Sequence, residues 1–316
     1  MNRIPGLRLL RRAERRGNEI GVPMTRGLGI VDLLKQSFRQ AGRDHLDAFA
    51  GNLTYKGLFA IFPFLVFLLS LLGLFGAAGL VETLLEQART AMPQEAVVLI
   101  EDQILGLVEA RATGAFTVGA IVAILAALWG VSGAFRAIME AMNVMYGVEE
   151  GRPLWKRYLI SILLSLGVTA LLLAALVLVV FGPSIGGAVA DLAGLGAVFQ
   201  WVWNILQWPV LAAFVLFSFA LIYYFAPDAE QSFRWISPGS VFAFTLWLVF
   251  SLLFSFYVNN FATYNATYGA LAGVAILMLY IYYSAYILLF GAEMNQVIEE
   301  HIPGGKDPGE KAPDTG

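Results

Sequence analysis

Few ionisable side chains border or enter the long apolar runs of this sequence, and these are the residues best placed to do chemistry. Lys56 lies at the start of an apolar run that continues to Gly76. Arg136 and Glu140 lie where a second run ends, and Glu293 lies where the last run ends. A charge at the centre of a bilayer costs roughly 2.5–3.5 kcal/mol, so a charge near a membrane usually has a partner or a function.

Helices are the elements that must position these side chains. Asn52 precedes Lys56 by four residues, and Arg136, Glu140 and Asn143 follow one another at spacings of four and three. Residues three or four apart share one face of a helix. Consecutive spanning helices alternate in direction, so the start of the first helix and the ends of the second and sixth should lie on one side of the membrane.

We therefore expect one polar cluster, drawn from three helix ends. Its members are Asn52, Lys56, Arg136, Glu140, Asn143, Glu293 and Asn295. In one interpretation the charges hold the first, second and sixth helices together, with Glu293 or Glu140 as the partner of Lys56. In the other, they form a polar vestibule that opens to the cytoplasm. Lys56 and Arg136 would then attract an anionic substrate or lipid headgroup, and the two glutamates would balance and gate them.

The composition indicates an integral membrane protein. Of the 316 residues, 59% are hydrophobic and 14% are charged, whereas soluble domains are about 45–50% apolar and about 25% charged. A spanning helix needs about 20 apolar residues. The run from Leu171 to Phe181 does not alternate between apolar and polar residues, which excludes barrel strands. The uncharged stretches predict an all-α bundle of six transmembrane helices, at about residues 50–77, 115–140, 157–181, 199–224, 236–258 and 269–296.

The distribution of Lys and Arg predicts the topology. Ten of them precede the first apolar run, whereas the predicted loops after the third and fifth helices contain none. Basic residues favour the cytoplasmic side, so we expect both termini in the cytoplasm of a bacterium and the bundle in its inner membrane. The predicted parts are a basic arm (1–48) with a short amphipathic helix at about 30–41, a transmembrane domain (49–300) with an outer helical loop at about 80–112, and a disordered tail (301–316).

Other sequence features make smaller predictions. The acidic residues of the outer loop are interpreted as the wet face of an amphipathic helix, so no metal site is expected. Gly269 and Gly273 form a G-x-x-x-G pattern, which lets helix backbones approach closely within the bundle. Cysteine is absent, which excludes disulfides and thiolate chemistry. No cofactor is expected, and the oligomeric state does not follow from the sequence.

Three stretches carry a resemblance to a known family. They are NLTYKGLFAIFPFLVFLLSLLG, which opens the first helix; WGVSGAFRAIMEAMNVMYGVEE, from Trp129 to Glu150; and TYGALAGVAILMLYIYYSAYILLFGAEMNQVIE, from Thr267 to Glu299. They resemble the YihY/BrkB family of six-helix bacterial inner-membrane proteins over most of residues 30–300. The resemblance implies a location more than a chemistry. The family carries a virulence-factor name and an older label as ribonuclease BN.

The residues argue against the ribonuclease label. A metal-dependent nuclease needs clustered His, Asp and Glu to activate water. The two histidines, His45 and His301, lie in unrelated segments outside the predicted spans, and no acidic cluster accompanies either. We therefore expect neither an enzyme nor a nucleic-acid partner.

Two functions remain after these exclusions. The first is binding or transport of an anionic or amphiphilic envelope molecule, such as a lipid or precursor, with membrane lipids as partners. The alternative is a non-transporting envelope scaffold whose outer loop or basic arm recruits other proteins. The sequence has no phosphate-binding G-x-x-x-x-G-K-[ST] motif, so any transport would be passive, ion-coupled or driven by another subunit.

Overall fold

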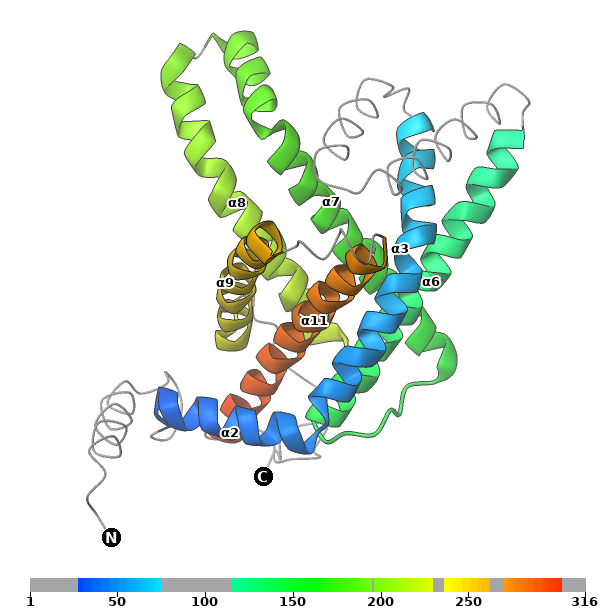
Figure 1. Cartoon of the computed structure of the whole chain (residues 1–316), viewed down its shortest axis with the longest axis vertical. Coiled ribbons are helices and arrows are strands. Elements are labelled where there is room, and N and C mark those ends of the chain that lie inside the picture. The colour runs from blue at the N-terminus through cyan, green and yellow to red at the C-terminus, as the bar shows by residue number, and fades with distance from the viewer. Residues whose placement is uncertain (1–27, 75–114, 195, 230–235, 262–269, 303–316) are drawn as a thin grey trace. The chain divides into compact units, whose positions relative to one another are not determined.

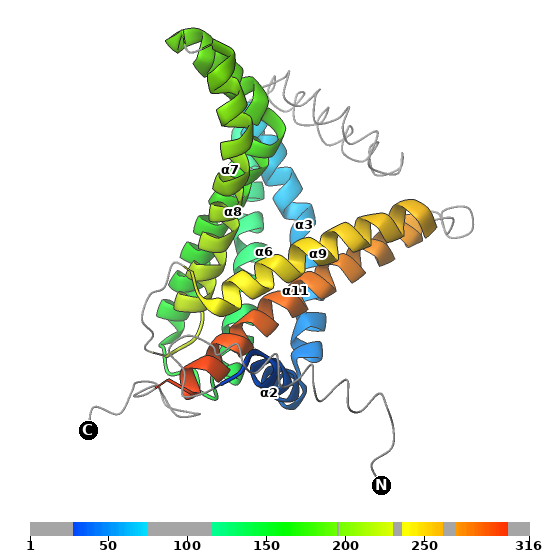
Figure 2. The ribbon, with the colours of Figure 1, turned by 90° about the vertical axis from the view of Figure 1, so that its left-hand side faces the viewer.

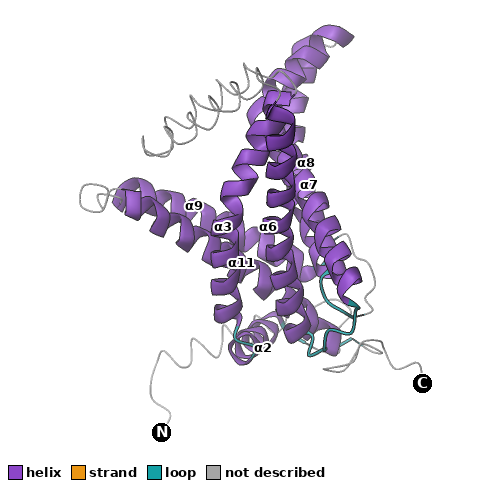
Figure 3. Ribbon diagram, turned by 90° about the vertical axis from the view of Figure 1, so that its right-hand side faces the viewer, coloured by secondary structure: helices purple, strands orange, loops and turns teal. Residues whose placement is uncertain are grey.

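The computed structural model describes residues 28–74, 115–194, 196–229, 236–261 and 270–302. Within these ranges every regular element is a helix, which confirms the all-α fold class (Figure 3). In chain order the helices are α2 (Ile30–Arg43), α3 (Leu46–Leu74), α6 (Ala115–Met145), α7 (Leu154–Ala193), α8 (Gly196–Phe225), α9 (Pro238–Phe261) and α11 (Ala270–Glu300).

Among the described residues, four helices contain a stretch long and apolar enough to cross a membrane. These stretches are Leu154–Val179, Val198–Phe225, Pro238–Val258 and Ala272–Glu300. Their large apolar side chains are widely exposed, for example Leu252 and Phe256 in α9. A helix whose apolar side chains point outward suits a lipid surrounding, because its backbone hydrogen bonds are satisfied within the helix. Long helices also occupy the first two predicted positions, as α3 and α6.

The chain divides into two compact units. The first comprises Met1–Phe49, Ile138–Trp247 and Tyr286–Gly316, and the second comprises Ala50–Ala137 and Leu248–Ala285. Because the boundaries fall inside helices, α3, α6, α9 and α11 each contribute residues to both units.

In the first unit α7 and α8 lie side by side (Figure 1). The indole N–H of Trp203 donates a hydrogen bond of 2.6 Å to the carbonyl of Gly182. A Cβ on Gly186 would collide with the Trp203 ring, so glycine permits this close approach. The predicted span of about 157–181 agrees with the apolar stretch Leu154–Val179, but the helix is longer than that stretch. Pro183 is accommodated inside α7, and the helix runs on to Ala193, where Gly194 closes it with a φ of 63°.

The amphipathic helix α2 also belongs to the first unit, and its predicted position at about 30–41 is close to the observed one. α2 lies against the C-terminal end of α11 (Figures 1 and 2). The rings of Phe38 and Phe290 are 4.8 Å apart between centroids, and the amide of Gln40 donates a hydrogen bond of 3.2 Å to Gln296. His45 takes a left-handed φ of 54° and turns the chain from α2 into α3.

In the second unit α9 and α11 pack side by side through aromatic rings (Figure 2). The centroid of Phe250 lies 5.8 Å from that of Tyr280 and 5.4 Å from that of Tyr283. The hydroxyls of Ser251 and Tyr280 are 3.2 Å apart and share a hydrogen bond. Several predicted features lie outside the described residues: the arm before residue 28, the outer loop at about 80–112, Gly269 of the G-x-x-x-G pattern, and the tail after residue 302.

Candidate functional site at the ends of the helices

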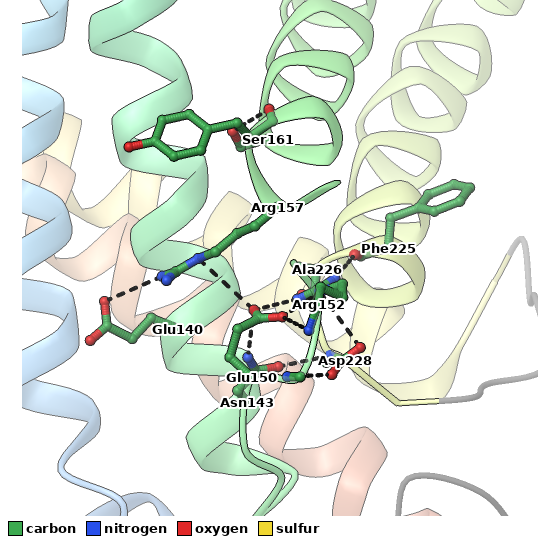
Figure 4. Close-up of polar contacts among 11 residues, drawn as sticks. Glu140, Asn143, Glu150, Arg152, Arg157, Ser161, Phe225, Ala226 and Asp228 are labelled. Atoms are coloured by element: carbon green, nitrogen blue, oxygen red, sulfur yellow. Dashed lines mark hydrogen bonds and ion pairs between the residues drawn. The ribbon is translucent and has the colours of Figure 1, made fainter. Parts of the chain in front are cut away.

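Arg152, in the connection between α6 and α7, is the centre of a polar network in the first unit (Figure 4). Its guanidinium donates two hydrogen bonds to Glu150, at 2.6 and 2.8 Å. It donates two more to the carbonyls of Phe225 and Ala226, at 3.2 and 2.9 Å, and Asp228 lies 3.6 Å away. The Arg152 side chain is only 6% exposed. These contacts use most of the donors of the guanidinium, so they join the α6–α7 connection to the end of α8.

Asn143, near the end of α6, strengthens the same junction. Its amide nitrogen donates to Glu150 at 3.0 Å, and its amide oxygen accepts the backbone N–H of Asp228 at 2.7 Å. The helix ends two residues later because Gly147 adopts a left-handed φ of 64° and Val148 donates its N–H back to the Asn143 carbonyl. The local turn therefore places the Asn143 side chain against the α8 end.

Glu150 is held in its charged form by this network. Burial raises the pKa of Glu150, but the hydrogen bonds and charge of Arg152, together with the Asn143 amide, outweigh burial and lower it below the ordinary value. A second arginine, Arg157, lies 3.9 Å from Glu150 and 4.0 Å from Glu140. The Glu140 side chain is 58% exposed, so its ion pair with Arg157 contributes little to stability.

Asn295, near the end of α11, connects that helix to the start of α9. Its amide oxygen accepts the N–H of Gly239 at 2.9 Å, and its amide nitrogen donates to the Ser237 hydroxyl at 2.9 Å. Ser237 and Ser240 exchange hydrogen bonds between hydroxyl and backbone N–H, and Pro238 occupies the first helical position. The reciprocal serine hydrogen bonds and the proline at the first position together stabilise the start of α9.

Glu293 has no comparable partners. Its side chain is fully buried, and neither carboxylate oxygen accepts a hydrogen bond from the described residues. The charged groups that act on Glu293 are Asp44 and Glu300, which are acidic like Glu293 itself. One turn away, the buried Gln296 is bonded to Gln40 and Glu300. Glu293 is therefore the buried group most able to take up a proton, a cation or a ligand.

The other predicted residues belong to the second unit. Asn52 and Lys56 are half-buried on α3. The guanidinium of Arg136 donates to the Ser132 hydroxyl at 2.9 Å and lies 5.5 Å from the centroid of the Trp129 ring. The predicted pairing of Lys56 with Glu293 or Glu140 would join the two units and stays a prediction.

Residues 37–315 match the family model described as "Virulence factor BrkB". The chain belongs to this family. The predicted resemblance is thereby confirmed, and the quoted stretches of all three helices fall within the matched range.

Membrane proteins are prominent among the relatives of this BrkB-family chain. It is 33% identical over 270 residues to the "putative ribonuclease-like protein YfkH" of Bacillus subtilis, covering 85% of this chain and 96% of that one. It is 26% identical over 279 residues to a "UPF0761 membrane protein" of Psychromonas ingrahamii, covering 85% and 88%. The "UPF0761 membrane protein IL2447" of Idiomarina loihiensis is 40% identical over 93 residues, or 29% and 32% of the two chains. No solved structure matches.

Sequence reasoning about this BrkB-family chain missed the Arg152 network. It treated Arg152 and Arg157 only as charges that set the topology, and it did not single out Glu150 or Asp228. A usable signal was present, because two acids and an arginine fall within the short α6–α7 connection and Asp228 lies soon after the end of α8. The spacing of Asn143 did point to this region, but its partners come from the ends of other elements.

Proposed function

We propose that this chain binds, and moves, an anionic or amphiphilic envelope molecule through a polar vestibule on the cytoplasmic side of a bacterial inner membrane. In this proposal α3 and α6 are the first two of six spans, and both termini are cytoplasmic. The residues that form the vestibule are Asn52, Lys56, Arg136, Glu140, Asn143, Glu293 and Asn295.

One observation carries the proposal, namely the buried carboxyl group of Glu293 without a hydrogen-bond partner in the described part of the chain. A buried polar group without a partner costs about 1–3 kcal/mol, and a charged one costs more. An ionisable residue inside a spanning segment is a functional candidate for this reason. A ligand or a proton would remove that cost.

The members of the cluster support the proposal unequally. Asn143 and Asn295 direct their amides to protein partners. Glu140 is exposed and faces Arg157. We therefore assign attraction of the anion to Lys56 and Arg136 and a balancing or gating role to Glu293, and a supporting role to the other four.

Native mass spectrometry of the gently extracted protein tests this function. We expect the wild-type protein to retain a bound anionic lipid or metabolite, and Lys56→Ala and Glu293→Ala to lose it. Glu149→Gln is the matched control, because it removes an exposed carboxylate outside the vestibule and should keep the adduct. Absence of any adduct, together with mutants that only unfold at lower temperature, would overturn the vestibule and leave the charges as helix staples.

The alternative is a non-transporting scaffold that recruits partners in the envelope. It is favoured by the internal use of the Asn143 and Asn295 amides, since side chains that hold helix ends together need no ligand. Affinity capture with the outer loop deleted distinguishes the two. A scaffold loses its partners with the loop, whereas the vestibule keeps its bound molecule.

We also propose that the chain is not an enzyme, although the name of its relative YfkH includes the words "ribonuclease-like". Both histidines have roles in the local structure of the chain. His45 forms the turn between α2 and α3, and the His301 ring lies 2.8 Å from the carbonyl of Val297. Hydrolysis of RNA by the purified protein, abolished by His301→Ala, would overturn this.

A further inference from the structure

α2 presents three different surfaces along its length. Leu33, Ser37 and Ala41 form its buried face. Ile30 and Phe38 lie eight residues apart on the apolar side of the helix, about 80° from one another around its axis, and they are 40% and 63% exposed. Phe38 keeps this exposure although its ring contacts Phe290. This flank, defined by Ile30 and Phe38, is an apolar surface that the described part of the protein leaves uncovered.

Basic side chains adjoin this flank. Lys35 and Arg39 lie three residues before and one residue after Phe38, and both are exposed. Arg43 is also exposed but lies farther round the helix from Phe38. An apolar strip bordered by Lys and Arg is typical of a helix that lies in a membrane interface, because the long basic side chains reach the headgroups while the ring enters the acyl boundary.

The contacts of α2 place it at the right depth. Phe290, which touches Phe38, lies near the end of an uncharged stretch that runs from Trp235 to Ala292. Gln296, which is bonded to Gln40, lies just beyond that stretch. α2 therefore crosses α11 where the spanning helix leaves its apolar segment, which is the level of the lipid headgroups.

We infer that the Ile30–Phe38 flank of α2, with Lys35 and Arg39, binds anionic phospholipids at the membrane surface. The occupant is lipid because the flank combines apolar exposure, positive charge and a contact at the edge of the apolar stretch of α11. This site is separate from the proposed vestibule, and neither depends on the other.

Spin labelling tests the position of the flank. The chain has no cysteine, so Phe38→Cys and Arg43→Cys each create a single labelling site in the full-length protein. In nanodiscs of phosphatidylcholine and phosphatidylglycerol, we expect the label at 38 to collide more with oxygen than with a water-soluble nickel complex. We expect the reverse at 43. Equal access of the nickel complex to both positions would overturn the inference.

Lipid affinity tests the role of the charges. Each basic residue near an anionic surface contributes about 1 kcal/mol, which is about a fivefold change in affinity. The double variant Lys35→Ala/Arg39→Ala should therefore bind phosphatidylglycerol about 25-fold more weakly, with binding of phosphatidylcholine unchanged. Arg43→Ala, which removes a charge of the same sign from the same helix, should change the affinity less than twofold. An equal loss in Arg43→Ala would show a general effect of charge and would overturn the site.

Discussion

Arg152 and Glu293 are both buried ionisable residues of the first unit, but their surroundings are opposite. Arg152 donates to a carboxylate and to two carbonyls, with a second carboxylate beside it. Glu293 has no hydrogen-bond partner among the described residues, and the charged groups that act on it, Asp44 and Glu300, are also acidic. A buried charge whose hydrogen bonds are all made has a structural role, because it holds the segments that it contacts together. A buried ionisable group without hydrogen-bond partners indicates a functional role, in which a ligand or a proton supplies the missing interaction.

The largest effect is expected from Arg152→Ala. It leaves Glu150 and Asp228 without their cation, and breaking a buried pair by removing one partner costs about 3–5 kcal/mol. The free energy of unfolding, measured by steric trapping in lipid, should fall by about 3 kcal/mol. Lys156→Ala, an exposed neighbour, should change it by less than about 0.5 kcal/mol. An equal change in the free energy of unfolding for both variants would show that the Arg152 network does not stabilise the fold. Arg152 would then no longer differ from Glu293 in this respect.

The Glu150 network also predicts a pH dependence. The pKa of Glu150 lies below its ordinary value of 4.5 in the folded protein, so the network contributes fully above that pH. The contribution is lost as the pH falls through the lower pKa of the folded state. The thermal midpoint of the wild-type protein should therefore drop more between pH 6 and pH 3 than that of Glu150→Gln. Parallel curves for the two proteins would contradict the prediction.

Glu293→Gln should have the opposite effect on stability. The change keeps the shape of the side chain and removes a charge that lacks hydrogen-bond partners, so we expect the free energy of unfolding to stay equal or to rise by about 1 kcal/mol. A large loss of stability would instead show that Glu293 has a structural partner, as Arg152 does.

The smallest effect is expected at Asp44, between α2 and α3. Burial raises the pKa of Asp44; Arg43 and His45 lower it in part, and Glu300 adds to the rise. A carboxyl group with a raised pKa destabilises the folded state once the pH exceeds its unfolded value of 3.8. Asp44→Asn should therefore raise the thermal midpoint slightly at pH 7 and not at pH 3. A lower midpoint at pH 7 would contradict this sign.

Helix positions were largely predictable, whereas helix ends and partners were not. The uncharged runs predicted helices at each of the six positions where the structure has long ones, because apolar length is a local property of the chain. The extension of α7 beyond residue 181 was not predicted, because the predicted range covered only the apolar span. A proline ends a helix only where its lost hydrogen bond and ring clash are not accommodated, and here the pairing with α8 keeps the helix intact.

By itself, the sequence determined the family, the membrane character, the all-α class and the amphipathic helix α2, since each follows from composition or from spacing along one chain segment. Only the tertiary structure decided which polar residues have partners. Asn143 and Arg152 find acceptors and donors at the end of α8, about 80 residues away along the chain, while Glu293, which is as polar, finds none among the described residues. Spacing along a helix determines which face a side chain occupies. Hydrogen bonds between helix ends depend instead on how those ends pack together in the tertiary structure.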